Sequence, residues 1–193
     1  MDILERHVAA EISVKNSRFL AELIPCSTQN GARALIKAQK EKYSDATHVV
    51  HAFIIGKSSE ILGMSDDGEP SGTAGRPVLD VLRGQGFTNA LLTVTRWFGG
   101  TLLGTGGLVK AYSSSAKEVT EKARAEGAIV PLVEYTEFSV TADYSLHGQL
   151  LHEFGKWHTK DIAEEFGTEV EIHGKIRTDE YDAFRNNFSR FFT

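Results

Sequence analysis

The chain has 193 residues, of which 41% are hydrophobic and 24% are charged, a balance typical of folded proteins. Its 26 acidic and 21 basic residues give a net charge of -5, which excludes a wholly basic nucleic-acid coat protein but not a local basic patch. The single cysteine, Cys26, excludes an internal disulfide and a cysteine-rich zinc module.

The first two thirds of the chain predict a mixture of strands and helices. Alternating apolar residues predict a strand over residues 18–24. Ser27 or Thr28 can cap a helix that runs to about Tyr43 and has a basic outer face. The segment 48–55 is apolar on both faces, which predicts a strand inside a sheet. The other expected elements are strands at 61–64 and 90–95, a helix with Pro77 in its first turn, and a long helix from about Gly106 to Glu126.

The last third of the chain has a clearer pattern. Strict alternation over residues 134–142 predicts a half-buried strand. A helix follows, then strands near 159–166 and 169–177, and then a helix that Asp179 caps. This order of strand, helix, two strands and helix is typical of a ferredoxin-like sandwich. The segment 189–193 is short for the last strand of that fold.

Charge separates these two parts of the chain. Residues 1–130 hold 15 basic and 14 acidic side chains, a net of +1, whereas residues 131–193 hold 6 and 12, a net of -6. This shift, together with Pro131, predicts a boundary between about Gly127 and Glu134. We therefore expect an α+β protein of two domains, residues 1–130 and 131–193.

Three carboxylates gather in the segment Ser65–Gly75, at Asp66, Asp67 and Glu69. Clustered carboxylates are ligands for Mg²⁺, although the spacing does not match an EF-hand loop. Alternatively, the Asp-Gly and Glu-Pro pairs form turns in which carboxylates accept hydrogen bonds from backbone N–H groups. The sequence favours this shaping of the loop, with Mg²⁺ binding as the open alternative.

A glycine-rich segment, residues 98–107, joins the strand ending at Arg96 to the long helix; we call it the glycine loop. Glycines let the backbone approach an anion closely, and the N–H groups at the start of a helix point at it. The pattern is neither a Walker A loop nor a dinucleotide-binding loop. The alternative is a packing surface against the Gly72–Gly75 loop. The predicted anion or nucleic-acid contacts are Arg96, Gly99, Gly100, Gly104, Thr105, Gly106, Gly107 and Lys110.

No catalytic residue can be argued from spacing. His48 and His51 are three apart on a predicted strand, so they point to opposite faces and cannot share a metal ion. The outer face of the C-terminal sheet is expected to be polar, without the aromatic residues that stack RNA bases. We therefore predict no cofactor and no metal site apart from the Mg²⁺ alternative.

Read together, the two glycine-rich segments resemble the IMPACT family and, within it, its bacterial YigZ-type members. The matching residues are Ser65–Pro77, Arg96, Phe98–Gly100 and Leu103–Tyr112, with Lys15–Phe19 and His48 also covered. The resemblance implies an N-terminal domain like the second domain of ribosomal protein S5 and a C-terminal domain like one in elongation factor G. Eukaryotic members regulate translation through an additional N-terminal domain, so we expect that role not to carry over directly.

These features favour a non-enzymatic, translation-linked protein that binds RNA or the ribosome through the glycine loop. A basic helix face adds to this expectation, formed by Arg33, Lys37, Lys40 and Lys42. Two alternatives stay open: an enzyme that holds a phosphorylated small molecule or nucleotide with Mg²⁺, and a module whose acidic C-terminal domain docks a protein partner. The charged N-terminus and the lack of a run near 18 apolar residues predict a cytoplasmic protein without a membrane partner. The sequence leaves the oligomeric state open.

Overall fold

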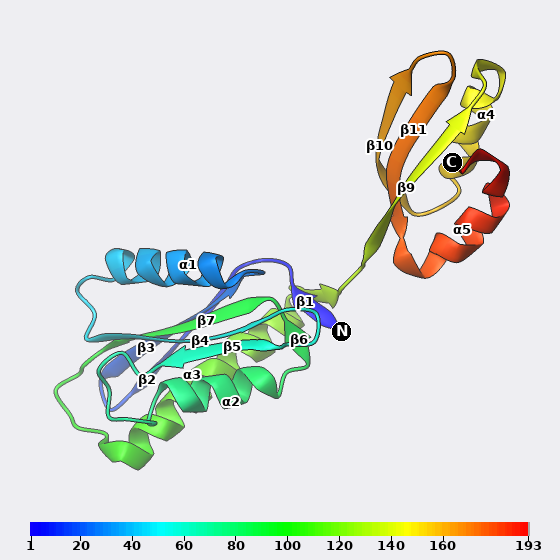
Figure 1. The fold of residues 1–193 in the computed structure, drawn as a ribbon. Helices are drawn as coiled ribbons and strands as arrows, with labels where there is room; N and C mark the ends of the chain where they lie inside the picture. The colour runs from blue at the N-terminus through cyan, green and yellow to red at the C-terminus, as the bar shows by residue number, and fades with distance from the viewer. Residues whose placement is uncertain (193) are drawn as a thin grey trace. The chain divides into compact units, whose positions relative to one another are not determined.

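The structure is a computed structural model that describes residues 1–192 (Figure 1). It divides into two compact units, one from Met1 to Leu132 and one from Val133 onward. Each unit combines helices with its own sheets, so the expected α+β class is confirmed. No helix among the described residues is both long enough and apolar enough to span a membrane.

A five-stranded antiparallel sheet organises the first unit, in the order β2-β3-β7-β4-β5. The middle strand, β7, is buried at all but its last residue, which explains its apolar sequence. The strands are β2 (Val8–Val14), β3 (Ser17–Pro25), β4 (His48–Ile55), β5 (Ile61–Ser65) and β7 (Ala90–Trp97). A smaller sheet contains β1 (Asp2–Leu4), β6 (Phe87–Thr88) and β8 (Ile129–Pro131).

Helices cover both faces of the large sheet. Helices α2 (Gly75–Arg83) and α3 (Gly104–Ala125) lie on one face, over the larger apolar core, and α1 (Gln29–Lys42) lies on the other (Figure 1). Thr28 caps α1 by accepting a hydrogen bond from the Gly31 N–H at 3.0 Å, as the sequence predicts. The predicted strands and helices of this unit are all present, but β1, β2, β6 and β8 were not predicted.

The second unit follows the predicted order of strand, helix, two strands and helix. Its elements are β9 (Tyr135–Ala142), α4 (Tyr144–Phe154), β10 (Thr159–Phe166), β11 (Val170–Arg177) and α5 (Tyr181–Asn187). The sheet order is β10-β11-β9, and both helices pack on one face over an aromatic core (Figure 1). Asp179 does not cap α5, because its carboxylate pairs with Arg177 and a 3₁₀ turn precedes the helix. Residues 189–191 form a second 3₁₀ turn, and Thr193 lies outside the described residues.

Candidate functional site

A buried polar network lies at the end of β7, where the glycine loop begins. The Arg96 guanidinium donates from Nη1 to Glu69 Oε1 at 2.6 Å, and the Tyr112 hydroxyl donates to the same oxygen at 2.8 Å. Burial, followed by the neighbouring Glu69 carboxylate, raises the pKa of Tyr112, so its hydroxyl stays protonated and donates. These contacts tie β7 and α3 to the loop that contains Glu69.

Arg96 therefore does not lie where the sequence predicts. The side chain was expected to contact an anion at the surface, but Arg96 is 5% exposed and its charge is paired with Glu69. The reason is its position in β7, where alternate side chains point into the apolar core between the sheet and the helices α2 and α3. We assign it to supporting the glycine loop and not to direct contact with a ligand.

The two aspartates of the Asp66–Glu69 turn accept hydrogen bonds from backbone N–H groups, and one of them also forms an ion pair. Asp66 accepts hydrogen bonds from the N–H groups of Gly72, Ala74 and Gly75, at 2.8 to 3.0 Å. Asp67 accepts from the Val49 N–H at 2.7 Å and pairs with Lys40. These contacts support the loop-shaping interpretation, and the carboxylate oxygens that Mg²⁺ would need are already engaged.

His48 links this turn to the buried network. Its Nδ1 donates to the Asp67 carbonyl at 2.8 Å, and its Nε2 lies 3.8 Å from Glu69 Oε2. His48 and His51 point to opposite faces of β4, as predicted: His51 faces the α1 side, where burial, followed by the charge of Lys40, lowers its pKa. Cys26 is buried, and this burial raises the pKa of its thiol, so it is not an activated nucleophile.

We expect Asp66→Ala to destabilise the first unit by about 1–2 kcal/mol, because the Asp66 carboxylate accepts the free N–H groups at the start of α2. Burial acts to raise the pKa of Asp66, but three backbone hydrogen bonds outweigh it and lower this pKa from its ordinary value. The stabilisation is therefore present above the unfolded-state pKa and is lost as the pH falls through the lower folded-state value. Urea unfolding between pH 2 and pH 6 measures this, with Asp66→Asn as the variant that cannot titrate.

The glycines of the loop have different physical roles. Gly99 is required by packing, because a Cβ there would lie 2.0 Å from the Asn16 carbonyl carbon. Gly100 and Gly104 have φ of 84° and 72°, the left-handed region that favours glycine. Gly106 has neither constraint: it lies in α3, and a Cβ there would meet no heavy atom within 4 Å. Its missing side chain leaves the helix start open to solvent.

The N-terminus of α3 is exposed and has no side-chain cap. Gly104, Thr105 and Gly106 are exposed, Gly107 is half-buried, and the N–H groups of this first turn have no partner within the helix. Lys110, about one and a half turns into α3, is also exposed, and no ion pair joins it to another described residue. Of the predicted contact residues, five are exposed, Gly99 and Gly107 are half-buried, and Arg96 is buried.

Two exposed apolar side chains belong to the same loop, and neither was among the predicted contact residues. Phe98 is 45% exposed and Leu102 is 83% exposed. The Arg96 guanidinium carbon lies 5.6 Å from the centre of the Phe98 ring, within the range of a cation–π interaction. Arg96 therefore connects this ring to the buried network. Phe98 follows β7, which ends at Trp97, and no pattern in the sequence indicates that its ring is exposed.

Comparisons with known proteins agree on one family. The model of the Impact N-terminal domain matches residues 15–120. The IMPACT family member YvyE of Bacillus subtilis is 34% identical over 176 residues, covering 90% of this chain and 78% of that protein. The IMPACT family member YigZ of Escherichia coli is 40% identical over 125 residues, covering 64% of this chain and 61% of that protein. A crystal structure described as that of a hypothetical protein has a TM-score of 0.69 and 28% identity, covering 98% and 91% of the two chains.

Proposed function

This chain belongs to the IMPACT family, and from that premise we propose that it is a translation-linked protein that binds RNA through the glycine loop and Lys110. The phosphate backbone of the RNA lies against the first turn of α3. The protein contributes no chemistry to the RNA, because its role is to hold and position it.

The observation that carries this proposal is the open, uncapped start of α3 together with Lys110, a cation that has no ion pair among the described residues. N–H groups at a helix start carry partial positive charge and bind phosphate oxygens. The space at Gly106 lets a phosphate approach the backbone closely, and Lys110 adds a full charge on the same surface. The exposed ring of Phe98 offers a surface on which an unpaired base can stack.

RNA is favoured over a nucleotide held with Mg²⁺ because Asp66 and Asp67 already have partners within this chain. Both accept hydrogen bonds from backbone N–H groups, and Asp67 also pairs with Lys40. The implied likeness of the N-terminal domain to a domain of ribosomal protein S5 supports the same choice by analogy. The basic face of α1 adds less than its charge suggests, because Lys37, Lys40 and Lys42 each pair with a carboxylate of this chain. The contact is therefore local, in keeping with the net charge of -5.

Lys110→Glu is expected to weaken RNA binding roughly tenfold or more at low salt and to reduce the slope of log affinity against log salt by about one. The cause is the loss of one phosphate contact and the repulsion from a carboxylate in its place. Fluorescence anisotropy with a labelled single-stranded RNA, and pelleting with ribosomes, over a salt series measure both quantities. Lys160→Glu, the same change in the second unit, should bind like the parent protein.

Gly106→Ala separates binding from folding. Alanine is the better helix former and meets no steric obstacle at this position, so the variant should be more stable by about 0.5–1 kcal/mol. Its methyl group fills the space for the phosphate, so RNA binding should fall while stability rises. If neither substitution changes the affinity, or the parent protein binds neither RNA nor ribosomes at low salt, the proposal is wrong.

A further inference from the structure

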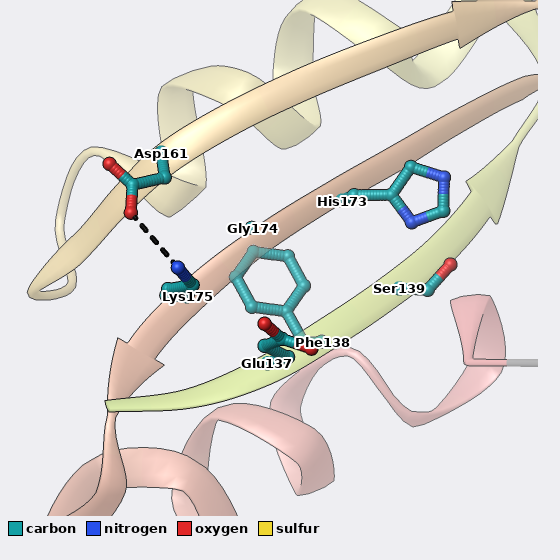
Figure 2. A pocket seen from close by; sticks show the side chains of 7 residues that line it. All are labelled: Glu137, Phe138, Ser139, Asp161, His173, Gly174 and Lys175. Carbon is teal, nitrogen blue, oxygen red and sulfur yellow. Dashed lines mark ion pairs between the residues drawn. The ribbon is translucent and has the colours of Figure 1, made fainter. Parts of the chain in front are cut away.

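Within the second unit, the described helices α4 and α5 both pack on one face of the sheet and leave its other face open. Alternation places apolar side chains of β9 and β11 toward α4 and α5 and polar side chains on the opposite face. This open face contains a cavity of about 520 Å³ above Gly174 (Figure 2). His173 of β11 and Ser139 of β9 line it and occupy opposite positions in the strand register.

Two carboxylates lie beside His173 on this face. Glu165 of β10 is directly opposite Glu171 of β11, and His173 is two residues further along the same strand. One ligand atom from each of Glu165, Glu171 and His173 lies within 4.8 Å of the other two. His173 Nε2 is 3.6 Å from Glu171 Oε1, close to the separation of about 3.4 Å between two ligands of one tetrahedral ion.

Glu165 and Glu171 lie opposite each other without a permanently charged cation as a partner among the described residues. Carboxylates directly opposite each other on neighbouring strands repel. Among the described residues, no lysine or arginine pairs with Glu165 or Glu171, and Lys175, the nearest cation on β11, pairs with Asp161 at 3.4 Å (Figure 2). A divalent cation between Glu165 and Glu171 would convert this repulsion into attraction.

We propose that Glu165, Glu171 and His173 bind a divalent transition-metal ion of the zinc class. One imidazole and two carboxylates are a ligand set for such ions, whereas Mg²⁺ prefers oxygen ligands alone. Three protein ligands leave a fourth position to water, and Glu165 is exposed enough to rotate into the coordination sphere. The ion links β10 to β11 near their connecting turn and therefore stabilises this edge of the sheet.

Ser139 is the positioning residue of this site. Its hydroxyl donates to Glu171 Oε1 at 3.1 Å and so fixes the direction in which this carboxylate points. Groups that orient metal ligands in this way typically change metal affinity by about 10- to 100-fold when they are removed. Ser139→Ala should therefore weaken metal binding by about tenfold without removing a ligand.

Isothermal titration of the full, chelator-treated chain with ZnCl₂, and separately with MgCl₂, tests the site. We expect one Zn²⁺ per chain and much weaker Mg²⁺ binding. His173→Ala and Glu171→Gln should each weaken Zn²⁺ binding by on the order of 100-fold, beyond the effect of an orienting group. In NMR spectra, the His173 ring signals should be the histidine signals that shift first during the Zn²⁺ titration.

His158→Ala is the matched control, because His158 also contacts a carboxylate, Glu180, at 2.6 Å, but residues 1–192 place no third ligand with this pair. This variant should bind Zn²⁺ like the parent chain. The proposal is overturned if the parent chain takes up no Zn²⁺ at millimolar concentration, or if His173→Ala and Glu171→Gln bind it as the parent does. Both replaced side chains are partly exposed, so circular dichroism should show that the variants fold.

Discussion

Replacing Arg96 with alanine is expected to destabilise the first unit by about 3–5 kcal/mol, a large fraction of the stability of a typical domain. The substitution leaves the Glu69 carboxylate buried, at 7% exposure, without its charge partner. The Tyr112 hydroxyl still donates to Glu69, but one neutral hydrogen bond cannot replace an ion pair away from water. Urea unfolding at neutral pH measures the loss, which should appear in the midpoint and not in the slope.

Two further variants separate the ion pair from the packing of the Arg96 side chain. Tyr112→Phe keeps the ring, its edge-on contact with Phe19 and the ion pair, so it should cost only about 1–3 kcal/mol. Adding Glu69→Gln to Arg96→Ala should restore part of the loss, because no unpaired charge then remains buried. If the double variant is as unstable as the sum of its single variants, the uncompensated charge is not the cause.

The burial of Arg96 in this network determines how binding data on its variants should be interpreted. Loss of RNA binding in Arg96→Ala would follow from a displaced glycine loop and would not identify a phosphate contact. Lys110 and Gly106 are the informative positions, since both are exposed and neither contributes to the buried network. A binding defect in their variants with unchanged or raised stability locates the contact surface.

Local patterns in the sequence were sufficient to predict most strands and helices. The apolar alternation of β9 and the Thr28 cap of α1 are signals contained within a few residues, and both are present in the structure. The strands β1, β6 and β8 have two or three residues each, too few for any periodicity, and they form because distant segments pair. Their pairing depends on the packed unit and not on their own sequence.

The candidate sites were less predictable because they depend on contacts between distant residues. Glu69 and Arg96 are 27 positions apart, and nothing in either segment indicates that the charges pair. The sequence alone does not distinguish one glycine of the loop from another. In the structure, Gly99 packs against the backbone of Asn16, whereas a Cβ at Gly106 would meet no heavy atom within 4 Å. In the second unit, the strand register places Glu165 opposite Glu171, and this register is fixed only by the folded sheet.

Phe184→Ala is expected to unfold the second unit while the first stays folded. Phe184 is fully buried and contacts Phe138, Phe154, Phe188 and Trp157 in the aromatic core. Removing such a ring costs about 3–5 kcal/mol, and a unit of about 60 residues has little more stability than that. The core of the first unit contains none of these residues, so its stability should not change.

The chain offers an internal reporter for each unit, because one of its two tryptophans, Trp97, lies in the first and the other, Trp157, in the second. In Phe184→Ala, the indole N–H signal of Trp157 should lose its folded-state shift, and that of Trp97 should keep it. Phe184→Leu, which replaces most of the ring volume, should retain both signals and cost less than the alanine variant. Loss of both signals in Phe184→Ala would show that the two units unfold together, so that neither core is stable without the other.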